Sequence, residues 1–428
     1  MSVVLLGISL SAFGGRMLDP VVPVARPAPS DSEPAQATDA EMEEDTEPAE
    51  GSVRDAEPAD EADADNDAEP VPAAPPKRWQ WSQKFTLGVS YDDNIFISAP
   101  HKEADAIFKL SADFGLLWGD YLNKEENFLS IQYAPSVSLF AEHREQNAFE
   151  QDAALAGQWR LTKLTLGAQA RVQSLSGGDV DVGERAERNL YRIALTSKYD
   201  YSDKTSFEIN LSQNTADYRT HLDSVEWVNR NWLDYQLWPK TRVGVGMTLG
   251  YLEPEGGDSQ TYEQFLARVA LPATGKLSFM AEGGVEIRQS VGAEGKRTTP
   301  VFRGGVSYRP FDGTEVSVEA SRRNYSSASL AGQNYTATGV TATVRQRFFQ
   351  RFFLTLAAGY EDAEYQATDA KVSPSRHDQY LFVRPGISVA VTKRSSLELY
   401  YQYRRNESTA ASSSFENNVT GIQASISF

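Results

Sequence analysis

The sequence predicts an all-β fold, a transmembrane up-and-down antiparallel β-barrel of eighteen strands preceded by a disordered acidic segment. Three observations predict it. Residues 79–428 alternate apolar and polar side chains, short turns alternate with longer polar loops, and aromatic residues gather near the ends of the alternating segments. A period of two residues is typical of strands, and long strands with this asymmetry of turns are typical of outer-membrane barrels.

The composition narrows the alternatives. The 428 residues contain no cysteine, which excludes disulfides, thiolate metal sites and cysteine nucleophiles. The mean hydropathy is −0.45 and no run of eighteen apolar residues follows the start, so the sequence predicts no transmembrane helix. The alternating apolar and polar residues of barrel strands give a low average hydropathy, so a membrane location stays open.

The formal net charge of −18 belongs mostly to one stretch of the chain. Between Pro29 and Pro70 there are 17 acidic residues against one basic residue, Arg54. The rest is nearly neutral, so the acidic balance says nothing about partners of the folded part. No basic concentration suggests nucleic acid.

The chain divides into three expected parts. Residues 1–15 hold a short apolar run followed by small residues, which favours a signal segment, although a basic start is missing. Residues 16–76 form an acidic leader rich in Pro and Ala, which cannot bury enough apolar surface to offset its ordering entropy and is expected to be disordered. Residues 79–428 are expected to form the outer-membrane barrel.

Residues 129–139 illustrate the alternation. Leu129, Ile131 and Tyr133 share one face, and Ser130 and Gln132 share the other. Successive side chains of a strand point to opposite faces, so each such segment predicts a strand with one apolar and one polar side. The same pattern recurs to the end of the chain.

Turns give the strand count. Seven tight turns and an eighth, longer one at 119–126 join strands two to seventeen in pairs, and the free first and last strands make eighteen. Short turns are expected on the periplasmic side, which also places both termini there, and long loops outside. The tight turns are 161–163, 202–204, 238–240, 273–276, 310–313, 349–351 and 392–394, and examples of long loops are 174–185, 253–259, 289–298, 326–333 and 362–376.

The eighth strand, near residues 225–237, leaves a question open. Trp227, Leu233 and Tyr235 share a parity that also puts Asn229 and Asn231 in the lipid zone. A β-bulge would re-aim these two side chains.

A soluble β-sandwich is the alternative fold, because its strands also alternate. Sandwich strands are usually shorter than the segments here. Two groups of aromatic residues near opposite strand ends also fit the two girdles of a membrane barrel. The chain ends on an apolar-alternating strand at Phe428, which resembles the signal read by the outer-membrane assembly machinery.

The segment Tyr91-Asp92-Asp93-Asn94-Ile95-Phe96 resembles the opening motif of the porin-2 type of β-barrel families. With the strand rhythm and Phe428, the resemblance covers the whole strand region. It implies an outer-membrane conduit, and since some relatives lie with exopolysaccharide export systems it also implies polysaccharide. The Asp-Asp-Asn run favours Asx turns that end the first strand. A Ca²⁺ site is the alternative, but no further ligand spacing supports it.

Nothing in the sequence points to catalysis or to a cofactor, so we expect a protein that is not an enzyme. The four histidines, at 101, 143, 221 and 377, fall in expected outer loops. Glu142-His143-Arg144-Glu145 contains metal-ligand types without the spacing of a site. Catalysis would need a nucleophile, a base and an orienting group together.

Charged residues are expected to face the lumen, because a charge near the middle of the lipid face would cost about 2–4 kcal/mol. They would either guide anionic or sugar solutes or hold the wall together as salt bridges, and both readings stay open. The candidates by parity are Arg171, Arg192, Arg268, Arg288, Arg303, Arg323, Arg345, Arg347, Arg384, Arg404, Glu208, Glu282, Glu286, Glu315, Glu319 and Glu398.

Three functions follow from the sequence. The first is a porin-like outer-membrane channel for passive passage of small hydrophilic or anionic solutes. The second is a conduit for polysaccharide export, working with periplasmic export components. The third is a barrel without transport that binds or anchors at the surface. The expected partners are outer-membrane lipid and the assembly machinery that reads the C-terminal strand.

Overall fold

The computed structural model describes residues 79–119, 127–271, 276–291, 295–368 and 376–428. The expected signal segment (1–15) and acidic leader (16–76) lie outside these ranges. Most residues of the two predicted turns at 119–126 and 273–276 also lie outside them.

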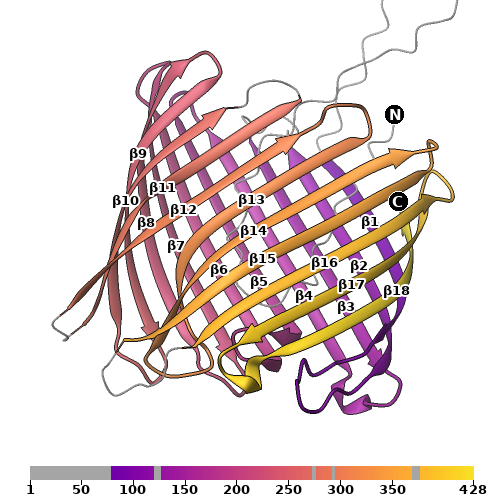
Figure 1. The fold of residues 1–428 in the computed structure, drawn as a ribbon. Coiled ribbons are helices and arrows are strands. Elements are labelled where there is room, and N and C mark those ends of the chain that lie inside the picture. The colour runs from indigo at the N-terminus through magenta and orange to yellow at the C-terminus, as the bar shows by residue number, and fades with distance from the viewer. Residues whose placement is uncertain (1–78, 120–126, 272–275, 292–294, 369–375) are drawn as a thin grey trace, which may run out of the picture. The chain divides into compact units, whose positions relative to one another are not determined.

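Eighteen antiparallel strands form a single sheet in which each strand pairs with its neighbours in the chain (Figure 1). Two short 3₁₀ turns, η1 (Arg144–Gln146) and η2 (Ala411–Ser413), lie in loops. The strands are β1 (Trp79–Asp92), β2 (Asp105–Gly119), β3 (Phe128–Phe140), β4 (Ala148–Arg160), β5 (Leu164–Asp179), β6 (Glu184–Asp200), β7 (Thr205–Tyr218), β8 (Ser224–Trp238), β9 (Thr241–Pro254), β10 (Gln260–Leu271), β11 (Leu277–Ser290), β12 (Lys296–Tyr308), β13 (Thr314–Ser326), β14 (Gln333–Phe348), β15 (Phe352–Ala367), β16 (His377–Ala390), β17 (Ser395–Ser408) and β18 (Phe415–Ser427).

The sheet closes on itself. Phe85 of β1 is the register partner of Ala112 on β2 and of Ile426 on β18. At the end of the seam, the backbone N–H of Phe428 donates to the carbonyl oxygen of Gln83 over 2.8 Å. A closed barrel has no free strand edge, which is the requirement for a sheet inside a membrane. The predicted eighteen-stranded up-and-down barrel is confirmed.

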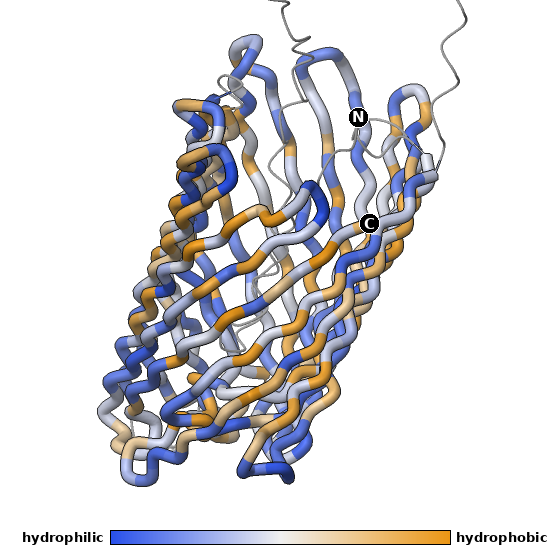
Figure 2. The backbone as a smooth tube through the Cα atoms, turned by 90° about the vertical axis from the view of Figure 1, so that its right-hand side faces the viewer, coloured by the Kyte–Doolittle hydropathy of each residue, from blue (hydrophilic) through white to orange (hydrophobic). Residues whose placement is uncertain are grey.

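The outward face of the sheet is apolar. Leu87 and Val245 expose 58% and 61% of their surface, and both lie on strand faces that point away from the lumen. Figure 2 shows hydrophobic and hydrophilic residues alternating along the strands. An exposed apolar band of this extent is stable in lipid rather than in water. Among the described residues, no α-helix is long and apolar enough to cross a membrane.

Several predicted loops are wrong in extent, because the strands continue through them. The expected loop 174–185 is instead the paired ends of β5 and β6, with Gly178 opposite Arg185, and β15 extends through most of the first half of the expected loop 362–376. His377, expected in a loop, is the first residue of β16. Polar composition marks where the lipid zone ends, whereas pairing between neighbouring strands persists beyond it.

The open question at β8 has a clear answer. The strand pairs regularly with β7 and β9 through Asn229 and Asn231, and its register shift lies later, between Gln236 and Trp238. No bulge re-aims the two asparagines, which therefore stay on the outward face.

Candidate functional site

The polar face of the sheet points into the lumen, where four of the predicted arginines form ion pairs with carboxylates. All of these pairs except Arg288 with Glu286, which both lie on β11, join one strand to another, and each pair reduces the net field that a solute would meet. The lumenal pairs are Arg171 with Asp152 (2.9 Å), Arg268 with Glu208 (2.9 Å) and Asp234 (2.8 Å), Arg288 with Glu286 (2.7 Å), Arg384 with Glu398 (3.3 Å), and Arg230 with Glu282 (3.7 Å).

Three other predicted arginines each contact a neutral group. Arg192 donates to Asn214 over 3.2 Å, Arg404 donates to Asn417 over 2.8 Å, and Arg323 lies over the Tyr325 ring at 5.3 Å. A lumenal arginine beside a neutral partner keeps more of its field than one beside a carboxylate.

Arg303 and Arg345 differ from the paired arginines. Within the described ranges, neither has a carboxylate oxygen within 4.0 Å. Arg303 is the register partner of Glu282, but that carboxylate turns to Arg230 instead. Arg345 lies over the Phe353 ring at 4.4 Å. Within these ranges no close ion pair offsets the charge of either arginine, although Arg345 is the register partner of Glu315.

Sequence analysis predicted inward glutamates but missed the inward aspartates. Asp152 and Asp234 bind lumenal arginines, and Asp113 lies on the inward parity opposite Lys84. The alternation could have identified them, because they share parity with polar neighbours. The inner wall carries both signs of charge, and Glu319, a predicted lumenal residue, lies opposite Gly305.

Several inward aromatic rings lie against glycines of the neighbouring strand. A Cβ atom on Gly246 would stand 2.5 Å from the Trp232 ring, and one on Gly250 would stand 2.0 Å from the Tyr262 ring. Arg268 covers the Trp232 ring at 4.2 Å. Glycine thus lets the ring lie close to the wall, and the guanidinium covers it. The same arrangement joins Gly250, Tyr262 and Arg288, and also Gly421, Tyr400 and Arg384.

Loops from distant strands meet across the mouth at the loop side. The hydroxyl of Ser327, after β13, donates to Asp181 over 2.9 Å, and the N–H of Ala328 donates to the same carboxylate over 2.7 Å. Asp181 lies between β5 and β6. Six strands, β7–β12, separate β6 from β13 on one side of the ring, and eight separate β14 from β5 on the other. The hairpin formed by β13 and β14 therefore reaches nearly to the opposite wall.

Both faces of this hairpin are buried. On one face Tyr325 and Tyr335 stack at 5.2 Å, and Tyr335 contacts Tyr365 at 4.8 Å. On the other face Asn324 donates to Glu286 over 2.9 Å, and Asn334 donates to Gln260 over 2.6 Å. Burial on two sides means that the loop-side end of the hairpin packs inside the mouth rather than standing in solvent.

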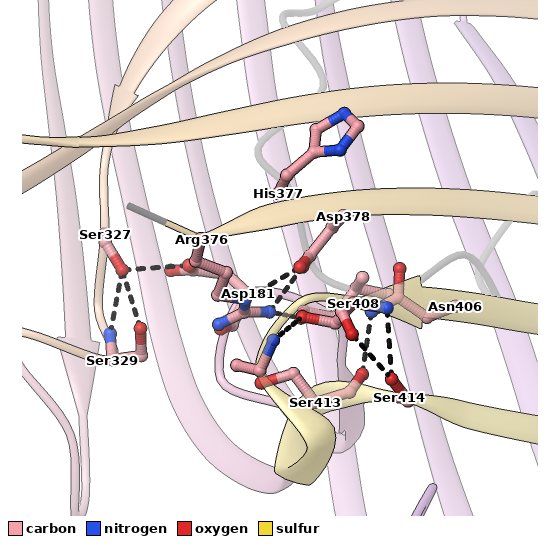
Figure 3. Close-up of polar contacts among 12 residues, drawn as sticks. Asp181, Ser327, Ser329, Arg376, His377, Asp378, Asn406, Ser408, Ser413 and Ser414 are labelled. Atoms are coloured by element: carbon pink, nitrogen blue, oxygen red, sulfur yellow. Dashed lines mark hydrogen bonds and ion pairs between the residues drawn. The ribbon is translucent and has the colours of Figure 1, made fainter. Parts of the chain in front are cut away.

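Arg376, in the loop before β16, binds the β5–β6 loop and so stabilises the packing of the loops in the mouth. Figure 3 shows its guanidinium between Asp181 and Asp378. It donates to the carbonyl oxygen of Asp181 over 2.6 Å, to that of Val180 over 2.9 Å, and through Nε to Asp378 over 2.9 Å. The Tyr365 ring lies 4.4 Å from it. Sequence analysis did not single out Arg376, because the two carbonyl groups that it binds across the mouth are far away in the chain.

The predicted Asx chemistry of the opening motif is confirmed. The N–H of Asn94 donates to the Asp92 carboxylate over 2.9 Å, and the Asn94 side chain caps the loop by donating to the Ser98 carbonyl over 2.9 Å. Asn417 of β18 also donates to Asp92, and Asn418 donates to Asp93 over 2.8 Å. The motif fastens β1 to β18 at the seam. In the described part of the chain, no group of His, Asp and Glu side chains is arranged to hold a metal ion.

His143 joins two loops. Its Nδ1 lies 2.9 Å from Asp105 and its Nε2 lies 2.6 Å from Glu103. Hydrogen bonds to Asp105 and then Glu103 raise the pKa of His143 above its ordinary 6.5. The proton is therefore held more tightly here than in a free imidazole.

The family comparison concerns the C-terminal third of the chain. Residues 280–428 match the model of the family described as "Putative beta-barrel porin 2". This confirms the resemblance to the porin-2 family over those residues, although the opening motif at 91–96 lies outside the match. A search of curated proteins finds no match. The family and the apolar outer band identify an outer-membrane β-barrel.

The solved structures that match this chain include two from Pseudomonas aeruginosa and one from Acinetobacter baumannii. OccK11 (OpdR) of Pseudomonas aeruginosa is 12% identical, with 81% of this chain and 96% of that chain covered and a TM-score of 0.39. OccAB4 of Acinetobacter baumannii is 10% identical, with 83% and 100% covered and a TM-score of 0.43. OccK2 (OpdF) of Pseudomonas aeruginosa is 10% identical, with 81% and 98% covered and a TM-score of 0.43. Such identities and scores say nothing about the solute of this chain.

Proposed function

We propose that the chain is an outer-membrane channel for passive passage of small hydrophilic or anionic solutes. The observation that carries the proposal is the closed eighteen-strand sheet with an apolar outer face and a charged, hydrogen-bonded inner face. Sheets of this strand number are wide enough to enclose water. The β13–β14 hairpin would then set how much of the loop-side mouth is open.

The same proposal covers the orientation of the barrel in the membrane and the roles of the N-terminal segments and the C-terminal residue. Both termini face the periplasm, the leader (16–76) is a disordered segment there, and residues 1–15 direct export. The assembly machinery reads the last strand at Phe428. Deleting Phe428 is expected to lower the amount of barrel in the outer membrane, whereas Phe428→Tyr keeps it. Normal levels of the deletion variant would contradict that role.

Conductance in planar bilayers tests the channel. The purified full chain is expected to pass ions, with a modest preference for anions, because uncompensated positive charge on a wet wall raises the local concentration of anions. Replacing Arg303 and Arg345 together by Gln should lower the permeability ratio of chloride to potassium. The matched control replaces Arg384 and Glu398 together by Gln, which removes one charge of each sign and should leave the ratio nearly unchanged.

Two outcomes would overturn parts of the proposal. Absence of conductance in the unaltered chain would exclude the passive channel and favour the export conduit or the barrel without transport. Equal effects of the two double variants would mean that Arg303 and Arg345 do not set selectivity. Flux of an oligosaccharide without ion conductance would favour polysaccharide export.

A further inference from the structure

Two asparagines interrupt the apolar outer face. On β8, Asn229 and Asn231 are flanked on the same face by Trp227 toward the loops and Tyr235 toward the turns. These two aromatics have the positions of interface girdle residues, so the asparagines lie at the depth of lipid tails.

The neighbours of the two amides are apolar on both sides. Asn229 lies opposite Leu211 of β7 and Leu249 of β9. Asn231 lies opposite Ile209 and Met247 in the same way. All four neighbours are exposed on the outward face. Nothing polar on the adjacent strands is in register to receive the amides.

The asparagines hydrogen-bond to each other, with Asn231 Nδ2 donating to Asn229 Oδ1. This bond leaves the amide N–H₂ of Asn229 and the amide oxygen of Asn231 without a protein partner among the described residues. Hydrocarbon offers no hydrogen bonds, so leaving these groups against lipid tails is unfavourable. Each primary amide carries both donors and an acceptor, so each asparagine can complement the same asparagine of an identical chain.

The outer face beside the asparagines is hollowed. A groove of about 510 Å³ lies over β3 to β7, and Ile209 and Leu211, the neighbours of the asparagines, line one of its sides. Small residues at its floor, Gly157 and Ala168, leave the space. A groove beside a row of bulky side chains is suited to packing against another protein surface.

We propose that the outward face around β8 is the contact with a second copy of this chain. The two barrels share one orientation in the membrane, so the contact is a twofold about an axis along the membrane normal, and identical residues meet at the same depth. There the amide of each asparagine donates to the amide oxygen of the same asparagine in the other copy, and the reverse. Polar side chains that hydrogen-bond between membrane segments stabilise such contacts. This inference is independent of what the barrel transports.

Cysteine crosslinking in outer membranes tests the contact, because the chain has no cysteine of its own. Asn231→Cys is expected to form a disulfide-linked dimer on mild oxidation. The matched control is Leu399→Cys on β17, an equally outward position on a distant part of the ring, which should stay monomeric. Equal crosslinking of the two variants, or a crosslink from residue 231 only to a protein of different mass, would overturn the proposal.

Light scattering in detergent gives a second measurement. The unaltered chain is expected to be a dimer. Replacing Asn229 and Asn231 together by Leu should raise the dissociation constant of the dimer by about tenfold or more. The reason is that the hydrogen bonds between the two copies, which stabilise the dimer, are lost. The variant places apolar groups against lipid and is expected to keep the strand. Its folding is checked by the heat-dependent shift in mobility of the barrel on a denaturing gel. A monomeric unaltered chain, or a dimer unaffected by the double change, would overturn the contact.

Discussion

Arg376 donates to the carbonyl oxygen of Asp181 over 2.6 Å, although the two residues are 195 positions apart in the chain. The contact joins the loop before β16 to the loop between β5 and β6. The same Asp181 holds the β13–β14 hairpin through Ser327 and Ala328. The conformation of the loop-side mouth therefore depends on a few buried polar groups at the meeting point of three loops.

Replacing Arg376 by Gln should loosen this mouth. The change removes a buried guanidinium and leaves the Asp378 carboxylate unpaired, which is expected to cost about 3–5 kcal/mol locally. Single-channel recordings should show a higher mean conductance, and limited proteolysis should cut the β13–β14 hairpin faster. The control is Arg405→Gln, which breaks an exposed pair with Glu407. A variant with unchanged conductance and protease resistance would show that the loops stay packed without Arg376.

Replacing Gly250 by Ala should destabilise the barrel. The new Cβ would lie 2.0 Å from the ring of Tyr262, whose hydroxyl donates to Glu226 over 2.9 Å. Overpacking of this kind costs about 1–3 kcal/mol. Urea unfolding in detergent micelles measures the effect. Gly177→Ala, where nothing lies within 4 Å of the added atom, is the control and should change the unfolding free energy little.

Replacing Asn417 by Ala should weaken the seam between β1 and β18. The side chain is fully buried and donates to Asp92 and to the Asn94 carbonyl. Loss of donors to buried oxygens costs about 1–3 kcal/mol. The midpoint of urea unfolding should fall by more than in Ser425→Ala, which removes a hydroxyl contact with Thr86 on the same strand pair. Equal midpoints would mean that the motif does not fasten the seam.

The contact of His143 should depend on pH. Its folded-state pKa is raised above 6.5 by Asp105 and Glu103. The stabilisation is therefore fully present below the unfolded pKa and is lost as pH rises through the folded one. Hydrogen exchange in the β3–β4 loop should be faster in His143→Gln than in the unaltered chain at about pH 5.5, and similar in both at about pH 9. A difference that persists at the higher pH would contradict a charge-dependent contact.

The sequence predicted the barrel because its signal is local. Leu129 and Ser130 already tell the two faces of a strand apart, and repetition of that pattern with short turns between segments predicts the strand number. Arg303 falls on the expected inward side for the same reason, with the exposed Phe302 next to it on the outward side. The alternation placed the charged residues on the inward face. It could not tell that Arg288 is paired with Glu286, whereas Glu282, the register partner of Arg303, pairs with Arg230 instead.

The tertiary structure decided everything that depends on closure of the ring. The side-chain period of two residues sets which face a residue occupies, and that is a property of neighbouring positions alone. Contacts across the mouth, such as Arg376 with Asp181, depend on which distant loops the closed sheet brings together. The same holds for Asn417 at the seam, and for Asn229 and Asn231, whose outward direction required the register of β8 against β7 and β9. Alternation along the chain thus determined the barrel and its two faces, and only long-range strand pairing determined what meets at its mouth, its seam and its outer wall.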